Sequence, residues 1–173
     1  PQTMVLVDPV MGDYGKLYRT FRSDVAQALR RLLKLADVLT PNLTEACILA
    51  DRRYDENMSD DDIFSLAEQL CSLNARACVV SGVIRGGEMT NFIYSREHGR
   101  STVSVRRIGN DRSGTGDVFS AVILGSLVNG MNLKSAGEKA AAFVEASVRR
   151  AVELSIPPTD GLPFEETLSM LWS

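Results

Sequence analysis

The chain has 173 residues, 45% of them hydrophobic and 24% charged, which suits one folded domain with a buried core. Its formal net charge of −3 argues against a nucleic-acid partner, because such proteins usually present a basic surface. No apolar run approaches the roughly 20 residues that a membrane span needs, so we expect no membrane partner. The three cysteines are odd in number and form no C-x-x-C pair, which indicates neither a disulfide framework nor a zinc site and predicts reduced thiols in the cytoplasm.

Short β-rich runs and amphipathic helices alternate through the first half of the chain. A buried-strand pattern over 4–7 stands almost at the start with no methionine at position 1, so we expect that preceding residues have been removed. A second strand is expected at 37–39, with a helix after it that continues through Glu45. A third helix should begin after Ser59, a good cap, with three aspartates in its first turn. The helix predicted over 21–35 directs five apolar side chains inward: Phe21, Val25, Leu29, Leu32 and Leu33.

The second half begins with a buried run at 77–80 that Ser81 and Gly82 should close. Strands at 90–94 and 102–105 follow, with turns at 86–87 and 97–99, and then helices over 114–129 and 133–154. This alternation predicts a single α/β domain over 1–173, with a largely parallel sheet and an added antiparallel hairpin. The inward face of the last helix should carry six side chains: Ala140, Phe143, Val144, Ser147, Val148 and Ala151.

The segment 113–117 is the most informative candidate site, because ligands of open α/β sheets bind beyond the carboxyl ends of the strands. Gly114 and Gly116 stand directly before an apolar helix, where backbone N–H groups and the helix dipole can bind a phosphate. Asp117 then falls in the first turn, where it could take a proton from an attacking hydroxyl. The structural alternative is that an aspartate in a first helical turn only complements the helix dipole.

Three other strand ends carry polar residues, each with a structural explanation of its own. Asp8 and Asp13 flank a glycine-containing loop that could face magnesium and phosphates, or that could be an ordinary turn. Asn42 and Glu45 match a capping box, and by spacing alone that interpretation is the stronger one. Ser81 could belong to a simple turn. The single histidine, His98, has no expected catalytic role, and neither a Walker motif nor a G-x-G-x-x-G motif is present.

Taken together, these segments resemble the pyridoxal/pyridoxamine kinases of the ribokinase-like superfamily. Residues 8–18 read DPVMGDYGKLY and resemble the family's DPVMGD-x-G-x-x-Y, residues 40–46 read TPNLTEA and resemble TPNxxEA, and residues 114–121 read GTGDVFSA and resemble GTGDxFSA. The order and approximate spacing also match, so the resemblance covers residues 5 to about 152.

The resemblance implies a ribokinase-like, doubly wound α/β fold whose N-terminal elements precede this chain. It also implies transfer of the ATP γ-phosphoryl to the 5′-hydroxymethyl group of pyridoxal, pyridoxamine or pyridoxine, with Mg²⁺ bound to the ATP. On this basis Asp117 is the base, and Gly114, Thr115 and Gly116 bind the transferring phosphoryl. Asp8, Asp13 and Glu45 lie around the magnesium, Asn42 and Ser81 contact phosphates, and Tyr18 ends a mobile loop that shields the site. A homodimer is expected, and a monovalent cation is an additional cofactor to test.

Two differences from the family pattern bear on the substrate. Ser81-Gly82 stands where pyridoxal kinases often have threonine, and 110–113 (NDRS) is closer to the DTTGAGD of the wider superfamily. Hydroxymethylpyrimidine kinases are the nearest alternative. They share DPVM and TPN segments but typically carry cysteine, in GTGC, where this chain has Asp117. A non-catalytic nucleotide-binding domain is the third alternative, which the presence of Asp117 disfavours.

Overall fold

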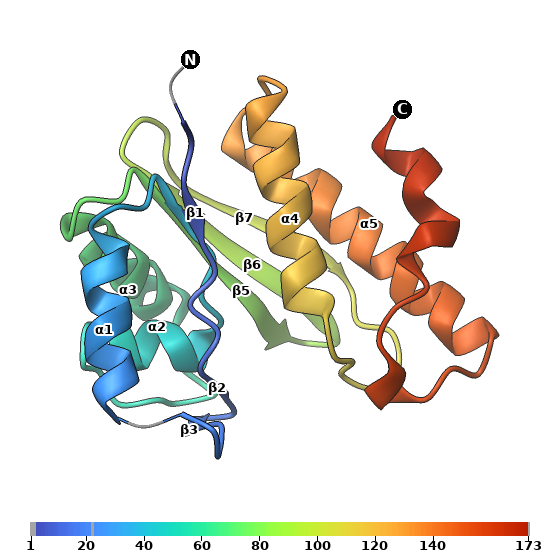
Figure 1. The fold of residues 1–173 in the computed structure, drawn as a ribbon, viewed down its shortest axis with the longest axis horizontal. Helices are drawn as coiled ribbons and strands as arrows, with labels where there is room; N and C mark the ends of the chain where they lie inside the picture. Colours follow the sequence, from blue (N-terminus) through green and yellow to red (C-terminus); the bar gives the residue numbers. More distant parts are fainter. Residues whose placement is uncertain (1–2, 22, 173) are drawn as a thin grey trace. The chain divides into compact units, whose positions relative to one another are not determined.

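A computed structural model describes residues 3–21 and 23–172 (Figure 1). The chain forms two compact units. The first comprises Pro1–Val83 with Asn91–Thr102, and the second comprises Ile84–Thr90 with Val103–Ser173.

A mixed five-stranded sheet has the order β1-β4-β5-β6-β7. The first three strands are parallel, with Val7 opposite Leu39 and Leu39 opposite Cys78. Tight turns join β5 to β6 and β6 to β7, so these neighbours run antiparallel. The predicted α/β class with an added hairpin is therefore confirmed. The strands are β1 (Leu6–Val7), β4 (Val38–Leu39), β5 (Ala77–Arg85), β6 (Glu88–Ser95) and β7 (Gly99–Arg106).

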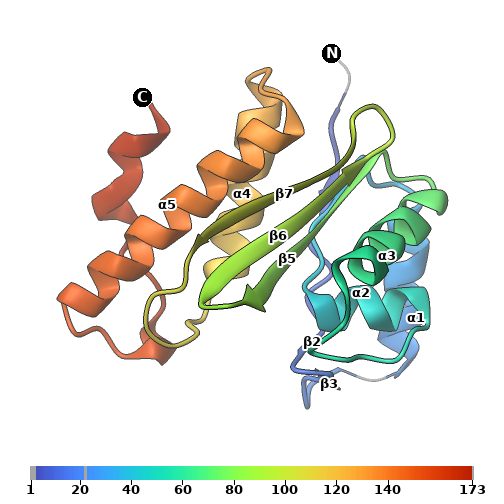
Figure 2. The same cartoon turned by 180° about the vertical axis from the view of Figure 1, so that it is seen from behind.

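Three helices lie beside one another in the first unit, as both ribbon views show (Figures 1 and 2). They are α1 (Ser23–Leu33), α2 (Leu43–Ala50) and α3 (Asp60–Ser72). Ser59 caps α3 as predicted, since its Oγ accepts a hydrogen bond from the Asp62 N–H at 3.2 Å. The core of this unit is fully buried and includes Leu33, Leu39, Leu66, Leu70, Val80 and Phe92.

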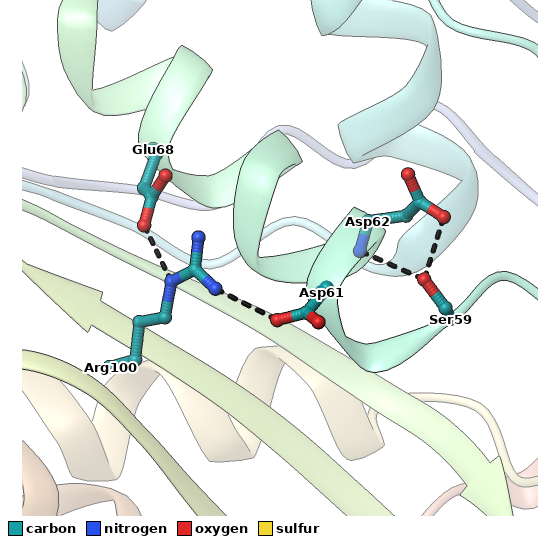
Figure 3. Close-up of polar contacts among 5 residues, drawn as sticks. All are labelled: Ser59, Asp61, Asp62, Glu68 and Arg100. Atoms are coloured by element: carbon teal, nitrogen blue, oxygen red, sulfur yellow. Dashed lines mark hydrogen bonds and ion pairs between the residues drawn. The ribbon is translucent and has the colours of Figure 1, made fainter.

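Arg100 of β7 joins α3 through two ion pairs (Figure 3). Its Nε lies 2.7 Å from Glu68 Oε1, and its Nη1 lies 3.0 Å from Asp61 Oδ1. The guanidinium also lies 5.2 Å from the centre of the Phe64 ring, within cation–π range. The hydrogen bond from Arg100 lowers the pKa of Glu68. A residue of the sheet thus anchors the helix that covers the core.

Two long helices form the second unit, α4 (Thr115–Val128) and α5 (Leu133–Glu153), followed by two short 3₁₀ helices, η1 (Pro158–Asp160) and η2 (Phe164–Leu171). The helices α4 and α5 run alongside each other (Figure 1). Four of the residues predicted to face inward from α5 are buried: Ala140, Phe143, Ser147 and Ala151. Val144 and Val148 are only half-buried, so the inner face of α5 is narrower than predicted.

Some sequence predictions for the first unit were wrong in detail. Met4 and Val5 are exposed rather than buried, because β1 is a two-residue strand at the end of the sheet order. Leu32 is 48% exposed, whereas its neighbour Leu33 is fully buried. The side chain of Val25 is outside the described residues. Among the described residues we find no helix with the length and apolar character to cross a bilayer.

Candidate functional site

The parallel strands of the first unit bring three of the predicted polar segments to one end of the sheet. Asp8 directly follows β1, and residues 40–42 directly follow β4. A parallel bridge then pairs Asn42 with Ser81, and the Ser81 N–H donates to the Pro41 carbonyl at 2.9 Å. The prediction that Ser81-Gly82 closes the strand was wrong, because β5 continues to Arg85. Gly82 adopts a φ of 71° within β5, and its N–H donates to Asn91 Oδ1.

A complete capping box forms the start of α2. The Glu45 N–H donates to Asn42 Oδ1 at 2.9 Å, and the Asn42 N–H donates to Glu45 Oε2 at 2.9 Å. The other carboxylate oxygen, Oε1, accepts the Met11 N–H at 3.0 Å. Both oxygens of this buried carboxylate therefore bind backbone groups, so Glu45 has the structural role that its spacing predicted.

Burial raises the pKa of Glu45 from 4.5 to about 7, against the opposing effect of the Asn42 and Met11 N–H groups. The negative charge of Asp8 raises this pKa further. A divalent cation close to both carboxylates would offset the repulsion between them. Since Glu45 already accepts two N–H groups, its expected action through a bridging water fits better than direct ligation.

Residues 12–17, predicted from the sequence as part of a glycine-containing loop or turn, form a β-hairpin. Strand β2 (Gly12–Asp13) pairs with β3 (Lys16–Leu17), and the turn residues Tyr14 and Gly15 have φ values of 49° and 75°. Two successive positive φ values are typical of a type I′ turn. The predicted mobility of this segment stays a prediction.

Three hydrogen bonds attach this hairpin, together with Met11 directly before it, to the N-terminal end of α2. The Met11 N–H binds Glu45, and the Gly12 carbonyl accepts from Asn42 Nδ2 at 2.8 Å. The Gly15 N–H donates to Thr44 Oγ1 at 2.9 Å. Tyr18 follows β3, and its N–H donates to the Met11 carbonyl. Asp13 is thereby carried on a hairpin fixed to the helix that holds Asn42 and Glu45.

The start of α4 has no side-chain cap among the described residues, in contrast to the capping box at the start of α2. Gly114 is the N-cap residue with a φ of 81°, a conformation that favours glycine, and no described side chain caps the helix. An added Cβ at Gly114 or Gly116 would meet no described heavy atom within 4 Å beyond the local backbone. Asp117 lies in the first turn and is exposed. The N–H groups of this turn are therefore accessible to an anion.

The residues before α4 are fastened to the chain that follows α5. Arg112 Nη1 donates to the Ile156 carbonyl at 2.8 Å and to the Pro157 carbonyl at 3.3 Å. The Ser113 N–H donates to the Pro158 carbonyl, and Thr115 Oγ1 donates to the Arg112 carbonyl at 3.1 Å. The residue pattern singles out neither Arg112 nor Thr44, and only the resemblance of the segments around them to known motifs points to these two parts of the chain.

The predicted site residues thus fall into two groups. Asp8, Asp13, Tyr18, Asn42, Glu45 and Ser81 belong to the first unit, and Gly114, Thr115, Gly116 and Asp117 belong to the second. Within the described ranges, no set of three or more His, Cys, Asp or Glu side chains forms a ready metal cluster. The assignment of magnesium to Asp8, Asp13 and Glu45 stays a prediction.

Known proteins with similar sequences include both B6-vitamer kinases and hydroxymethylpyrimidine kinases. The pyridoxine kinase of Bacillus subtilis is 31% identical over 157 residues, which cover 87% of this chain and 56% of that protein. Other relatives are named pyridoxal kinase or hydroxymethylpyrimidine/phosphomethylpyrimidine kinase. This chain thus spans about half the length of such kinases.

Solved structures match the fold. A Bacteroides thetaiotaomicron protein described as a putative phosphomethylpyrimidine kinase, crystallised with pyridoxal, superposes with a TM-score of 0.94 at 28% identity. The match covers 100% of this chain and 62% of that one. The pyridoxal kinase of Leishmania donovani, solved with ADP and pyridoxamine, gives a TM-score of 0.84 at 26% identity, covering 98% and 58% of the two chains. These likenesses confirm the predicted ribokinase-like fold.

A family model described as phosphomethylpyrimidine kinase matches residues 1–158, which is most of the chain. The chain therefore belongs to the phosphomethylpyrimidine kinase family of phosphotransferases, whose relatives include pyridoxal kinases.

Proposed function

We propose that the protein phosphorylates the 5′-hydroxymethyl group of pyridoxal, pyridoxamine or pyridoxine with ATP. The observation that carries this proposal is the start of α4, where exposed Asp117 follows uncapped glycine N–H groups. A carboxylate beside an anion site weakens anion binding, so its presence there is best explained by a role in a chemical step. Proton removal from an alcohol is such a step.

The reaction needs positioning and charge neutralisation more than covalent chemistry. The N–H groups of Gly114, Thr115 and Gly116 would hold the transferring phosphoryl, helped by the dipole of α4. Asp117 would accept the proton of the hydroxymethyl group while its oxygen forms the new bond to phosphorus. The bond between that phosphorus and the bridging oxygen breaks at the same centre, and ADP leaves.

Magnesium would neutralise the phosphate charge in this reaction. Asp8 and Asp13 are the residues of this chain that would hold it together with the phosphates, since magnesium usually binds one or two carboxylates and keeps several waters. Glu45 would act through water, and Asn42 and Ser81 would contact the nucleotide phosphates. Tyr18 would help the hairpin shield the site.

The choice of a B6 vitamer as acceptor rests on two supports. The first is Asp117 itself, where hydroxymethylpyrimidine kinases typically have cysteine. The second is the likeness to a structure with pyridoxal and to one with ADP and pyridoxamine. The alternative is a hydroxymethylpyrimidine kinase, which the family description and several relatives favour.

A competition assay with the full-length protein and Mg²⁺-ATP tests the proposal. Pyridoxal, pyridoxamine and pyridoxine are compared with hydroxymethylpyrimidine as acceptors, and kcat/KM is measured for each. We expect the highest value for a vitamer. A higher value for the pyrimidine would establish the alternative, and nucleotide binding without transfer to any acceptor would establish a non-catalytic role.

A further inference from the structure

The tip of the β2–β3 hairpin is seated on two residues that have no place in the chemistry proposed above. Thr44 is 1% exposed, and its Oγ1 accepts the Gly15 N–H at 2.9 Å. Tyr54 is half-buried and packs against the core after α2. The tip is therefore held separately from the base of the hairpin, which Asn42 and Glu45 bind.

The contact between Gly15 and Tyr54 is close. An added Cβ at Gly15 would lie 2.7 Å from Tyr54 Cδ1 and 3.1 Å from Cγ, so the ring occupies the space that a side chain would need. The φ of 75° at Gly15 independently favours glycine. Burial raises the pKa of Tyr54, and the charges of Glu56 and Asp13 raise it further, so Asp13 lies within electrostatic reach of this ring.

We propose that Thr44 and Tyr54 are positioning residues that hold the hairpin, and with it Asp13, in the conformation that binds nucleotide. This inference rests on the proposed function only in assigning the hairpin to the nucleotide site. Only the protein with the hairpin in place binds nucleotide well, so the apparent dissociation constant equals the intrinsic one divided by the fraction of molecules in that conformation. Loss of one hydrogen bond worth about 1 kcal/mol changes this conformational equilibrium roughly 5-fold, so the apparent dissociation constant should rise by up to about 5-fold.

The sharpest test replaces the Thr44 hydroxyl and compares it with a matched loss elsewhere. In Thr44→Val the Gly15 N–H loses its acceptor. Thr90→Val is the matched control, because it removes a buried hydroxyl whose hydrogen-bond partner is Ser104 Oγ, far from the hairpin in sequence. We expect Thr44→Val to raise the KM for Mg²⁺-ATP by up to about 5-fold with little change in kcat. Thr90→Val should leave both near the unaltered values.

Tyr54 provides a second comparison with a conservative rescue. The ring atoms make the contact with Gly15, so Tyr54→Phe should keep nucleotide affinity and Tyr54→Ala should lose it by a similar factor. Amide exchange of residues 12–18 should accelerate in Thr44→Val and Tyr54→Ala but not in Thr90→Val or Tyr54→Phe.

The readouts separate this inference from the proposed function. Amide exchange and direct titration with Mg²⁺-ADP need no phosphate acceptor, so they report on the seat even if neither vitamer nor pyrimidine is phosphorylated. Equal exchange in the hairpin and equal nucleotide affinity in Thr44→Val and Thr90→Val would overturn the inference. The inference would also be overturned if a lower melting temperature were the only difference between Thr44→Val and Thr90→Val.

Discussion

The helices α2 and α4 begin in opposite ways, although the sequence marks both starts as candidate phosphate sites. At α2, Asn42 and Glu45 satisfy each other's backbone N–H groups, and Glu45 also binds the hairpin. At α4, a glycine takes the N-cap position and no described side chain satisfies the first turn. A helix start that binds its own groups stabilises the fold, whereas one that leaves them accessible can bind a ligand.

Asp117→Asn should have the largest effect, because it tests whether the start of α4 takes part in catalysis. The exposed side chain contributes little to packing, so the substitution should leave stability nearly unchanged. Nucleotide affinity should be kept or should rise slightly, because a negative charge beside the phosphates is removed. We expect kcat to fall about 10²- to 10⁴-fold, the usual worth of general-base assistance. Asp62→Asn, in the first turn of α3, is the matched control and should turn over normally. Near-normal kcat in Asp117→Asn would remove this residue from the base role.

The structural role of Glu45 at the start of α2 should appear in the pH dependence of the free energy of unfolding. Because its pKa is raised to about 7 in the folded protein, the folded state holds this proton more tightly than the unfolded state. The free energy of unfolding should therefore fall by up to about 3 kcal/mol as pH rises from about 4.5 to 7, with no penalty below that range. Denaturant titrations at pH 5 and pH 7.5 measure this slope.

Glu45→Gln should flatten that slope, because the amide does not ionise. The exposed Glu165→Gln is the control and should keep the pH dependence of the unaltered protein. An unchanged slope in Glu45→Gln would mean that other groups produce it.

Substitution of the two glycines at the start of α4 should have smaller effects, on both stability and activity. Gly114→Ala should cost about 1 kcal/mol because of its φ of 81°, whereas Gly116→Ala, inside the helix, should stabilise the free protein by up to about 1 kcal/mol. Both methyl groups enter the space where the phosphoryl would bind, so both variants should have reduced kcat/KM. A Gly116→Ala variant with full activity would show that the phosphoryl does not approach this turn.

Local signals explain which predictions from the sequence succeeded. Ser59 and Asn42 cap their helices as predicted, because the bonds that they make lie within one turn of chain. The start of α4 at Gly114 was also predicted from the glycines. In each case the residue type alone restricts the local backbone.

Other features depend on contacts between distant segments and could not be predicted from local pattern. Tyr-Gly is a weak type I′ turn signal, and the hairpin at 12–17 is held by Thr44 and Tyr54, about 30 and 40 residues away along the sequence. Gly82 suggested a strand end, but the Asn91 side chain accepts its N–H and β5 continues. The exposure of Met4 and Val5 follows from strand order, which periodicity does not encode.

The fastening of Arg112 and Ser113 to residues 156–158 matters for protein engineering. The family match also ends at residue 158, so a designer trimming the chain to its shared part retains all three acceptor carbonyls. A stop codon only three residues earlier would remove them and release the segment that leads into Gly114. Fusion partners and affinity tags are therefore better joined beyond η1 than directly after α5.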